Sequence, residues 1–265
     1  MTAPSNSATF IQSARHRVSD QEWQVRVDLA ACYRLIARYG MTDLIYNHIT
    51  AKIPSRPDHF LLNPFGILYT EVTASCFYTV DLQGNIIDRP QGTVGDLPIN
   101  LAGFRIHGAV HAARPDVACV IHTHSRAGMA VSALKEGILP LTQTSMRFYK
   151  AIGYHDYEEP TSDVGEMERI ARDLGNHKAL ILRNHGLLAC GRSVADAWNV
   201  MYWLETACKV QIDALSTGRE LCLPTDELAT VMSRRYGPEG KLDVTPMEWP
   251  AMLRQLDKED DSYRS

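Results

Sequence analysis

Two short apolar segments that run up to histidines constrain the fold of this chain more than any other feature of its sequence. One is Val117–His122, which is rich in β-branched residues, and the other is Ala179–Leu182, which the turn Asn184-His185-Gly186 follows. Apolar runs of this length between turn residues are typical of buried strands. Such strands need other elements to cover them, so the chain is expected to build a packed sheet.

Helical and strand patterns alternate along the rest of the chain. Ser19 forms a capping box with Glu22 at the start of the first helix, and Ser193 begins the longest helix, which Gly218 ends. The sequence predicts strands at 48–53, 60–62, 77–80 and 86–87, and further helices at 98–113, 127–134 and 162–174. This alternation, with no linker or repeat, predicts a single α/β domain with a mixed sheet.

The chain divides into three parts by its patterns. Residues 1–18 are polar and are expected to form a flexible N-terminal arm, and residues 19–220 form the α/β domain. Residues 221–265 are less regular in pattern, and Trp249 lies in an apolar group within them. We expect this C-terminal extension to pack on the domain or on a neighbouring subunit.

The charge balance excludes a basic nucleic-acid binder. The chain has 27 basic and 31 acidic residues, and its net charge of −4 gives no footprint for nucleic acid or for an anionic membrane. The N-terminus lacks the apolar core of a signal peptide, and no stretch approaches the roughly 18 apolar residues of a membrane span. We therefore expect a cytoplasmic protein.

The strongest chemical signal is the sequence Ile121-His122-Thr123-His124-Ser125 at the end of a buried strand. In a strand, residues i and i+2 point to the same face, so His122 and His124 lie side by side. Two imidazoles can supply half of a divalent metal site, and His185, which also follows a buried strand, is the best candidate for a third ligand. Three protein ligands leave an open position, as catalytic zinc sites do. The alternative is that the pair fills space without binding metal.

These motifs resemble the class II aldolase/adducin family, in its bacterial adducin-like branch. The resemblance depends on His122-Thr123-His124-Ser125 after Arg114-Pro115-Asp116, on Asn184-His185-Gly186, and on the segment Asn63–Tyr69 followed by Thr73-Ala74-Ser75. It covers roughly residues 22–220. It implies a three-layer α/β/α domain whose central sheet is mixed and largely antiparallel.

The resemblance also implies a cofactor and an assembly. It implies one divalent metal per chain, most often Zn²⁺, with Fe²⁺ or Mn²⁺ as alternatives, held by His122, His124 and His185. It further implies a small-molecule substrate and a homotetramer that has its active sites at subunit interfaces.

The sequence departs from the family where the sugar-phosphate aldolases bind phosphate and move protons. Gly103 stands at the position of the family's catalytic glutamate, and Leu101 and Ala102 replace its serines. The glycine-rich phosphate turn corresponds to 44–48, which has neither the glycine nor the small hydroxyl residue. We therefore expect the metal site to be kept, and the phosphate site and the usual acid/base to be lost.

Other polar residues are candidates for proton transfer and for substrate binding. His107 lies four residues after Gly103 on the same helix, so it is a candidate acid/base, although an ordinary helix histidine is an equally good interpretation. The candidates for substrate binding are Asn47, His48, Asn63 and Arg147. Arg147 suits a carboxylate, which arginine holds with two hydrogen bonds.

Three functions remain open from the sequence. The first is a metal-dependent lyase of the aldolase type that stabilises an enediolate from a small, non-phosphorylated hydroxy- or oxo-acid. The second is a non-haem Fe(II) oxygenase on the same three histidines, as in oxygenases of aminocoumarin biosynthesis that resemble this family. The third is a non-catalytic, adducin-like scaffold of the actin cytoskeleton, although the chain keeps all three histidines and lacks a basic tail.

Overall fold

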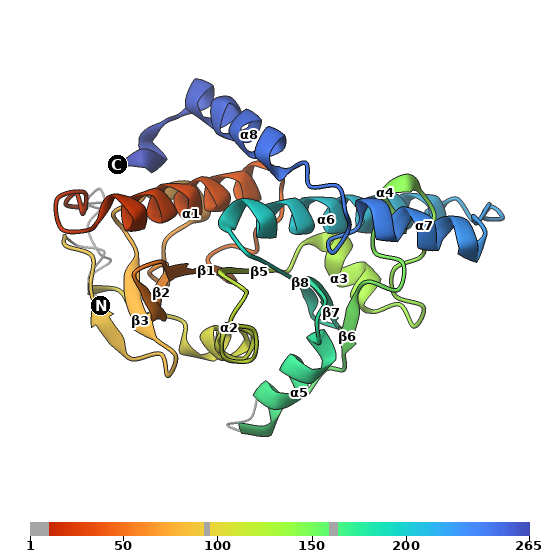
Figure 1. Cartoon of the computed structure of the whole chain (residues 1–265), viewed down its shortest axis with the longest axis horizontal. Helices are drawn as coiled ribbons and strands as arrows, with labels where there is room; N and C mark the ends of the chain where they lie inside the picture. The colour runs from red at the N-terminus through yellow and green to blue at the C-terminus, as the bar shows by residue number, and fades with distance from the viewer. Residues whose placement is uncertain (1–10, 93–95, 159–163) are drawn as a thin grey trace, which may run out of the picture.

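The strands of this protein form one mixed sheet in the computed structural model, which describes residues 11–92, 96–158 and 164–265 (Figure 1). The strands are β1 (His48–Ile53), β2 (Arg56–Leu62), β3 (Tyr78–Asp81), β4 (Ile86–Asp88), β5 (Cys119–Thr123), β6 (Gly153–His155), β7 (Ala179–Leu182) and β8 (Gly186–Gly191). Their order is β4-β3-β2-β1-β5-β8-β7-β6. Neighbouring strands are antiparallel except β6 and β7, which confirms the mixed, largely antiparallel sheet.

Helices cover both faces of this sheet. They are α1 (Asp20–Arg38), α2 (Leu101–Ala113), α3 (Arg126–Ser132), α4 (Gln143–Met146), α5 (Val164–Leu174), α6 (Val194–Ser216), α7 (Asp226–Tyr236) and α8 (Thr245–Glu259). Figure 1 shows α1 and α6 on one face and α2 and α5 on the other. The predicted three-layer α/β/α architecture is therefore present.

The central strands are buried on both faces, as the sequence predicts. In β5, Cys119 and Ile121 join the apolar core on the side of α1 and α6, whereas Val120 joins the core beneath α2 and α5. In β7, Ile181 and Leu180 divide between the two cores in the same way. This double burial explains why these strands read as continuous apolar runs.

Polar caps fix where the helices begin. The Ser19 side chain accepts the backbone N–H of Glu22 at the start of α1, and Ser193 does the same for Asp196 at the start of α6. Ser125, directly after the histidine pair, caps α3 through the N–H of Gly128. The chain thus turns from β5 into a helix within two residues of the metal motif.

The expected N-terminal arm lies partly outside the described residues, which begin at residue 11. Ile11 forms an isolated bridge with Gly92, and Ala14 is fully buried. The N–H of Ala14 donates to the Ser75 hydroxyl at 3.0 Å. The described part of the arm therefore packs against the rest of the domain through Ile11 and Ala14.

The C-terminal segment is more regular than its sequence pattern indicates. It contains α7 and α8, and α8 packs on α1 and α6. Pro246 lies in the first turn, where proline is favoured, whereas Pro250 lies within α8 and interrupts the helical pattern in the sequence. The end of the chain is also anchored, since Tyr263 is fully buried and its carbonyl accepts the N–H of Ala74.

In the described ranges, no helix combines the length and the apolar character that crossing a membrane requires.

Candidate metal centre

Three histidines converge at one end of the central strands. His122 is in β5, His124 directly follows it, and His185 lies in the turn between β7 and β8. β5 and β8 pair antiparallel with Thr123 opposite Leu187, which brings the His185 turn beside the end of β5. The ring centroids are 4.7 to 4.8 Å apart, and one ligand atom from each ring lies within 4.8 Å of the other two. The sequence-predicted ligands are thus brought together.

The turn that carries His185 depends on its two neighbours. Asn184 has a positive φ of 56°, a conformation that asparagine tolerates better than most residues. A Cβ on Gly186 would lie 2.3 Å from the carbonyl oxygen of Thr123, so only glycine permits this approach to β5. The sequence Asn-His-Gly therefore has a structural reason on both sides of the histidine.

Hydrogen bonds orient two of the rings. The Nδ1 of His122 lies 2.9 Å from the carbonyl oxygen of Leu187, and the Nδ1 of His124 lies 3.1 Å from the carboxylate of Asp43. Both acceptors take a proton from Nδ1, and in the neutral ring the Nε2 atom then carries the lone pair that a metal can bind. These two Nε2 atoms face one another at 3.0 Å.

This arrangement fits a cation. Burial and the neighbouring histidines hold the pKa of His122 well below its usual range, and burial lowers the pKa of His185 to about 4. These two rings are therefore neutral at pH 7, and the Nε2 atoms of His122 and His124 face one another at 3.0 Å. Neutral imidazole is the form that binds metal, so His122, His124 and His185 would be suited to hold a divalent cation.

A cavity of about 560 Å³ adjoins the three histidines. Its volume suits a small molecule. The apolar residues that line it include Ile106, Met129, Met167 and Leu182. The polar and charged residues that line it include Tyr46, Asn47, His48, Arg105, Asp156, Tyr157, Glu166 and Arg183.

Two of the predicted substrate residues line this cavity. Asn47 has a positive φ of 69°, and its Oδ1 accepts the backbone N–H of His124 at 3.2 Å. His48 pairs with His122 across β1 and β5 and is almost fully buried. Burial lowers the pKa of His48 to about 4, and its interaction with the backbone of Gly103 opposes that shift.

His107, the predicted acid/base, lies behind His48 and is not among the residues that line the cavity. The two ring centroids are 4.0 Å apart. The Nδ1 of His107 and the Nε2 of His111 both lie 2.8 Å from the hydroxyl of Thr50. His48 therefore separates His107 from the cavity. The spacing from Gly103 predicts the face of α2 on which His107 lies, but it does not predict how deeply the residue is buried.

Gly103 lines the cavity, and the ring of His48 leaves no room for a side chain at this position. A Cβ at this position would lie 2.4 Å from Cε1 of His48. The imidazole of His48 thus occupies the space into which a side chain at position 103 would project. The glycine at position 103 is therefore coupled to the position of the His48 ring.

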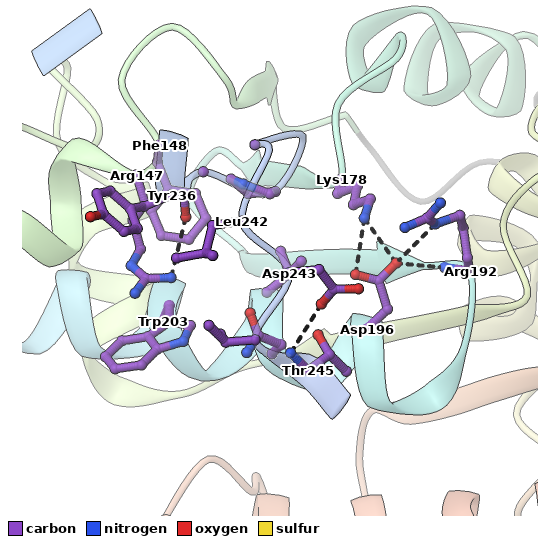
Figure 2. A pocket seen from close by; sticks show the side chains of 16 residues that line it. Arg147, Phe148, Lys178, Arg192, Asp196, Trp203, Tyr236, Leu242, Asp243 and Thr245 are labelled. Atoms are coloured by element: carbon purple, nitrogen blue, oxygen red, sulfur yellow. Dashed lines mark hydrogen bonds and ion pairs between the residues drawn. The ribbon is translucent and has the colours of Figure 1, made fainter. Parts of the chain in front are cut away.

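Asn63 and Arg147 lie away from the cavity. The side chain of Asn63 accepts the hydroxyl of Tyr33 at 2.9 Å, within the core. Arg147 lies over the ring of Trp203 at 4.4 Å and donates to the carbonyl of Tyr236. Figure 2 shows it in a separate small pocket beside the C-terminal segment. Its position after α4 directs it towards α6 and α7 instead of the histidines.

Other residues at the site have no signal in the sequence. Asp43 contacts His124 from the loop before β1, Arg105 comes from α2, and Tyr157 and Glu166 come from the segment around α5. The ring of Tyr157 lies 6.1 Å from that of His185. No motif or spacing marks them, because only the tertiary fold brings these segments to one end of the sheet.

Comparisons with known proteins agree with this geometry. The Class II Aldolase and Adducin N-terminal domain family matches residues 27–212. A Caulobacter vibrioides protein that is named after the class 2 aldolases is 48% identical over 251 residues, which cover 95% of this chain and 96% of that protein. The α-adducin of Rattus norvegicus is 41% identical over 245 residues, which cover 88% of this chain and 33% of the adducin.

A solved structure extends the similarity to nearly the whole fold. The L-fuculose 1-phosphate aldolase of Glaciozyma antarctica has a TM-score of 0.80 and 27% identity, and the match covers 98% of this chain and 97% of that chain. The family match spans most of the α/β domain and includes all three histidines. The chain therefore belongs to the class II aldolase and adducin family.

Proposed function

We propose that this protein is a metal-dependent lyase of the aldolase type. The observation that carries the proposal is the pair of Nε2 atoms of His122 and His124, which face one another at 3.0 Å beside His185 and a cavity of about 560 Å³. His122, His124 and His185 would hold one divalent metal, and we propose Zn²⁺ because imidazole ligands suit it. A metal held there acts as a Lewis acid on substrate oxygens.

The substrate class follows from the residues that line the cavity. Arg105 is exposed, and among the described residues it has no ion pair, so its guanidinium is available to a carboxylate. Residues 44–48 bring Tyr46 and Asn47 to the cavity, and they include neither a glycine nor a small hydroxyl residue. We propose a small, non-phosphorylated hydroxy- or oxo-acid. Tyr157 and Glu166 line the same cavity and have groups that exchange protons with a substrate.

The assembly belongs to the same proposal. Large apolar side chains are exposed around the cavity, including Tyr46 (49%), Met129 (42%) and Tyr157 (57%). Apolar groups that gather at the rim of a site are typical of a surface that a partner covers. We propose a homo-oligomer, a tetramer by family resemblance, that works in the cytoplasm.

Metal analysis and a cleavage assay together test this function. The purified protein is expected to contain about one divalent ion per chain, and His124→Ala is expected to lose it. The assay measures the aldehyde or ketone released from hydroxy- and oxo-acids with and without a phosphate group. His16→Ala is the matched control, because His16 is exposed and lies outside the site.

The outcomes separate the possibilities. Metal in the parent and in His16→Ala, its loss in His124→Ala, and cleavage of non-phosphorylated acids support the proposal. Equal metal content in all three proteins contradicts the ligand assignment. Metal that is present without cleavage of any acid contradicts the lyase.

The similarity to α-adducin favours a second candidate, an adducin-like binding protein. The 41% identity extends over 88% of this chain and over 33% of the adducin. A binding protein has no need of the facing Nε2 atoms, so a parent protein that holds no metal and cleaves no acid favours this candidate over the lyase.

A further inference from the structure

The loop between α1 and β1 holds His124 at two points. Asp43 Oδ2 lies 3.1 Å from the Nδ1 of His124, and Asn47 Oδ1 accepts the backbone N–H of His124 at 3.2 Å. Both contacts come from residues 43–47. We infer that this loop sets the position and ring orientation of His124, and that Asp43 is a positioning residue of the metal centre.

The backbone of the loop is built to deliver these contacts. The N–H of Tyr46 donates to the carbonyl of Asp43 at 2.8 Å and closes a tight turn. Within the turn Leu44 has a φ of 50°, which is costly for a branched residue, and its side chain is 72% exposed. Leu44 therefore gains no burial in return for its conformation. Strain of this kind persists where surrounding contacts fix the shape of a functional loop.

The chemistry of the contact explains its effect on a metal. A carboxylate that accepts the Nδ1 proton of a histidine fixes the tautomer and makes Nε2 a stronger ligand. The corresponding partner of His122 is the main-chain carbonyl of Leu187, which a side-chain substitution does not remove. Asp43 is thus the side chain through which the orientation of a ligand can be tested.

Zinc competition with a coloured chelator measures the contribution of Asp43. Asp43→Ala is expected to raise the zinc dissociation constant about 10- to 100-fold. Asp43→Asn is expected to show a smaller rise, because its amide oxygen can still accept the Nδ1 proton. The matched control is Asp156→Asn, which removes one exposed carboxylate at the same cavity; among the described residues, Asp156 has no hydrogen bond or ion pair to the three histidines.

Two further readouts separate positioning from folding. The visible spectrum of the Co²⁺-loaded protein is expected to change in Asp43→Ala and to stay unchanged in Asp156→Asn. The melting temperature of the metal-free protein is expected to be the same in Asp43→Ala and in the parent. A lower value in the metal-free variant assigns Asp43 to folding and overturns the inference.

The role of Asp43 rests on the metal site of the proposed function, but different results would contradict the role and the site. A parent protein that binds neither zinc nor cobalt removes both. A parent that binds zinc, with Asp43→Ala equally tight and spectrally identical, overturns this inference alone. An equal loss of zinc affinity in Asp156→Asn and Asp43→Ala would attribute the effect to net charge, and this result would also overturn the positioning role of Asp43.

Discussion

Gly103 and His48 act as a pair at the floor of the cavity. A Cβ at position 103 would lie 2.4 Å from the His48 ring, so each residue limits the size of the other. His48 cannot easily move aside, because its ring stacks on His107 at 4.0 Å, and His107 is held by Thr50. The glycine at position 103 is therefore required by the packing of the His48 ring.

Gly103→Ala is expected to destabilise the protein by about 1–3 kcal/mol, because the new methyl group overpacks against His48. Urea denaturation measures the change in the free energy of unfolding. Gly108→Ala is the matched control on the same helix, since its nearest contact would be an ordinary 3.6 Å. There alanine is expected to be neutral or to stabilise by up to about 1 kcal/mol. Similar losses at both positions would contradict the pairing of Gly103 with His48.

The residues of the site differ in how well the sequence predicts them. His122 and His124 could be placed together because a strand fixes the directions of residues i and i+2. Thr123 indeed points to the other side, where its hydroxyl lies 3.6 Å from the sulfur of Met201. The depth of His107 could not be predicted, because it depends on where α2 lies against β1.

At the scale of elements, local signals predict most boundaries. β1 has the predicted bounds of 48–53, and the capping serines mark the starts of α1 and α6. The helix predicted at 98–113 begins instead at Leu101, because Asn100 caps it by accepting the N–H of Gly103. The sequence prediction missed α8, which packs on α1 and α6, because Pro250 lies inside it and proline is unfavourable within a helix.

α8 is expected to depend on Trp249. The indole is 8% exposed, and its Nε1 donates to Asp28 on α1 at 3.1 Å. Trp249→Ala is expected to lower the free energy of unfolding by about 3 kcal/mol, as deletion of a buried aromatic ring does. Trp249→Phe keeps an aromatic ring but leaves Asp28, whose pKa burial raises, without the indole donor. We expect it to cost about 1 kcal/mol.

Met247→Ala is the control for α8, because Met247 is in the same helix and 69% exposed. It is expected to change the free energy of unfolding by less than about 0.5 kcal/mol. If Trp249→Ala were as mild as Met247→Ala in urea denaturation, α8 would not be held on α1 by this residue.

At the scale of the whole molecule, the sheet and α2 enclose several neutral histidines. Burial lowers the pKa of His48 to about 4 and that of His111 to about 3. His107 lies between them, and its pKa is also held well below its usual range by burial. In the unfolded chain these residues take up protons near pH 6.5. Folding therefore opposes protonation of the histidine layer formed by His48, His107 and His111.

The protein is expected to lose stability as the pH falls below about 6.5. Between that value and the folded pKa values of about 3 to 4, the unfolded chain binds more protons than the folded one, so acid favours unfolding. Each of these histidines contributes a loss of about 1 kcal/mol per pH unit, and above pH 6.5 the full stability is present. Urea denaturation of the metal-free protein from pH 7.5 to 5 measures the slope.

His111→Gln distinguishes this layer from the other titrating groups. His111 is buried in the core, against the ring of Phe60 at 4.3 Å, and glutamine keeps a polar side chain there without a proton to gain. The slope of stability against pH is expected to be shallower by about 1 kcal/mol per pH unit in His111→Gln. The exposed His16→Ala is expected to keep the slope of the parent. Parallel curves for all three proteins would mean that His111 is not neutral in the fold, and that the acid sensitivity has another source.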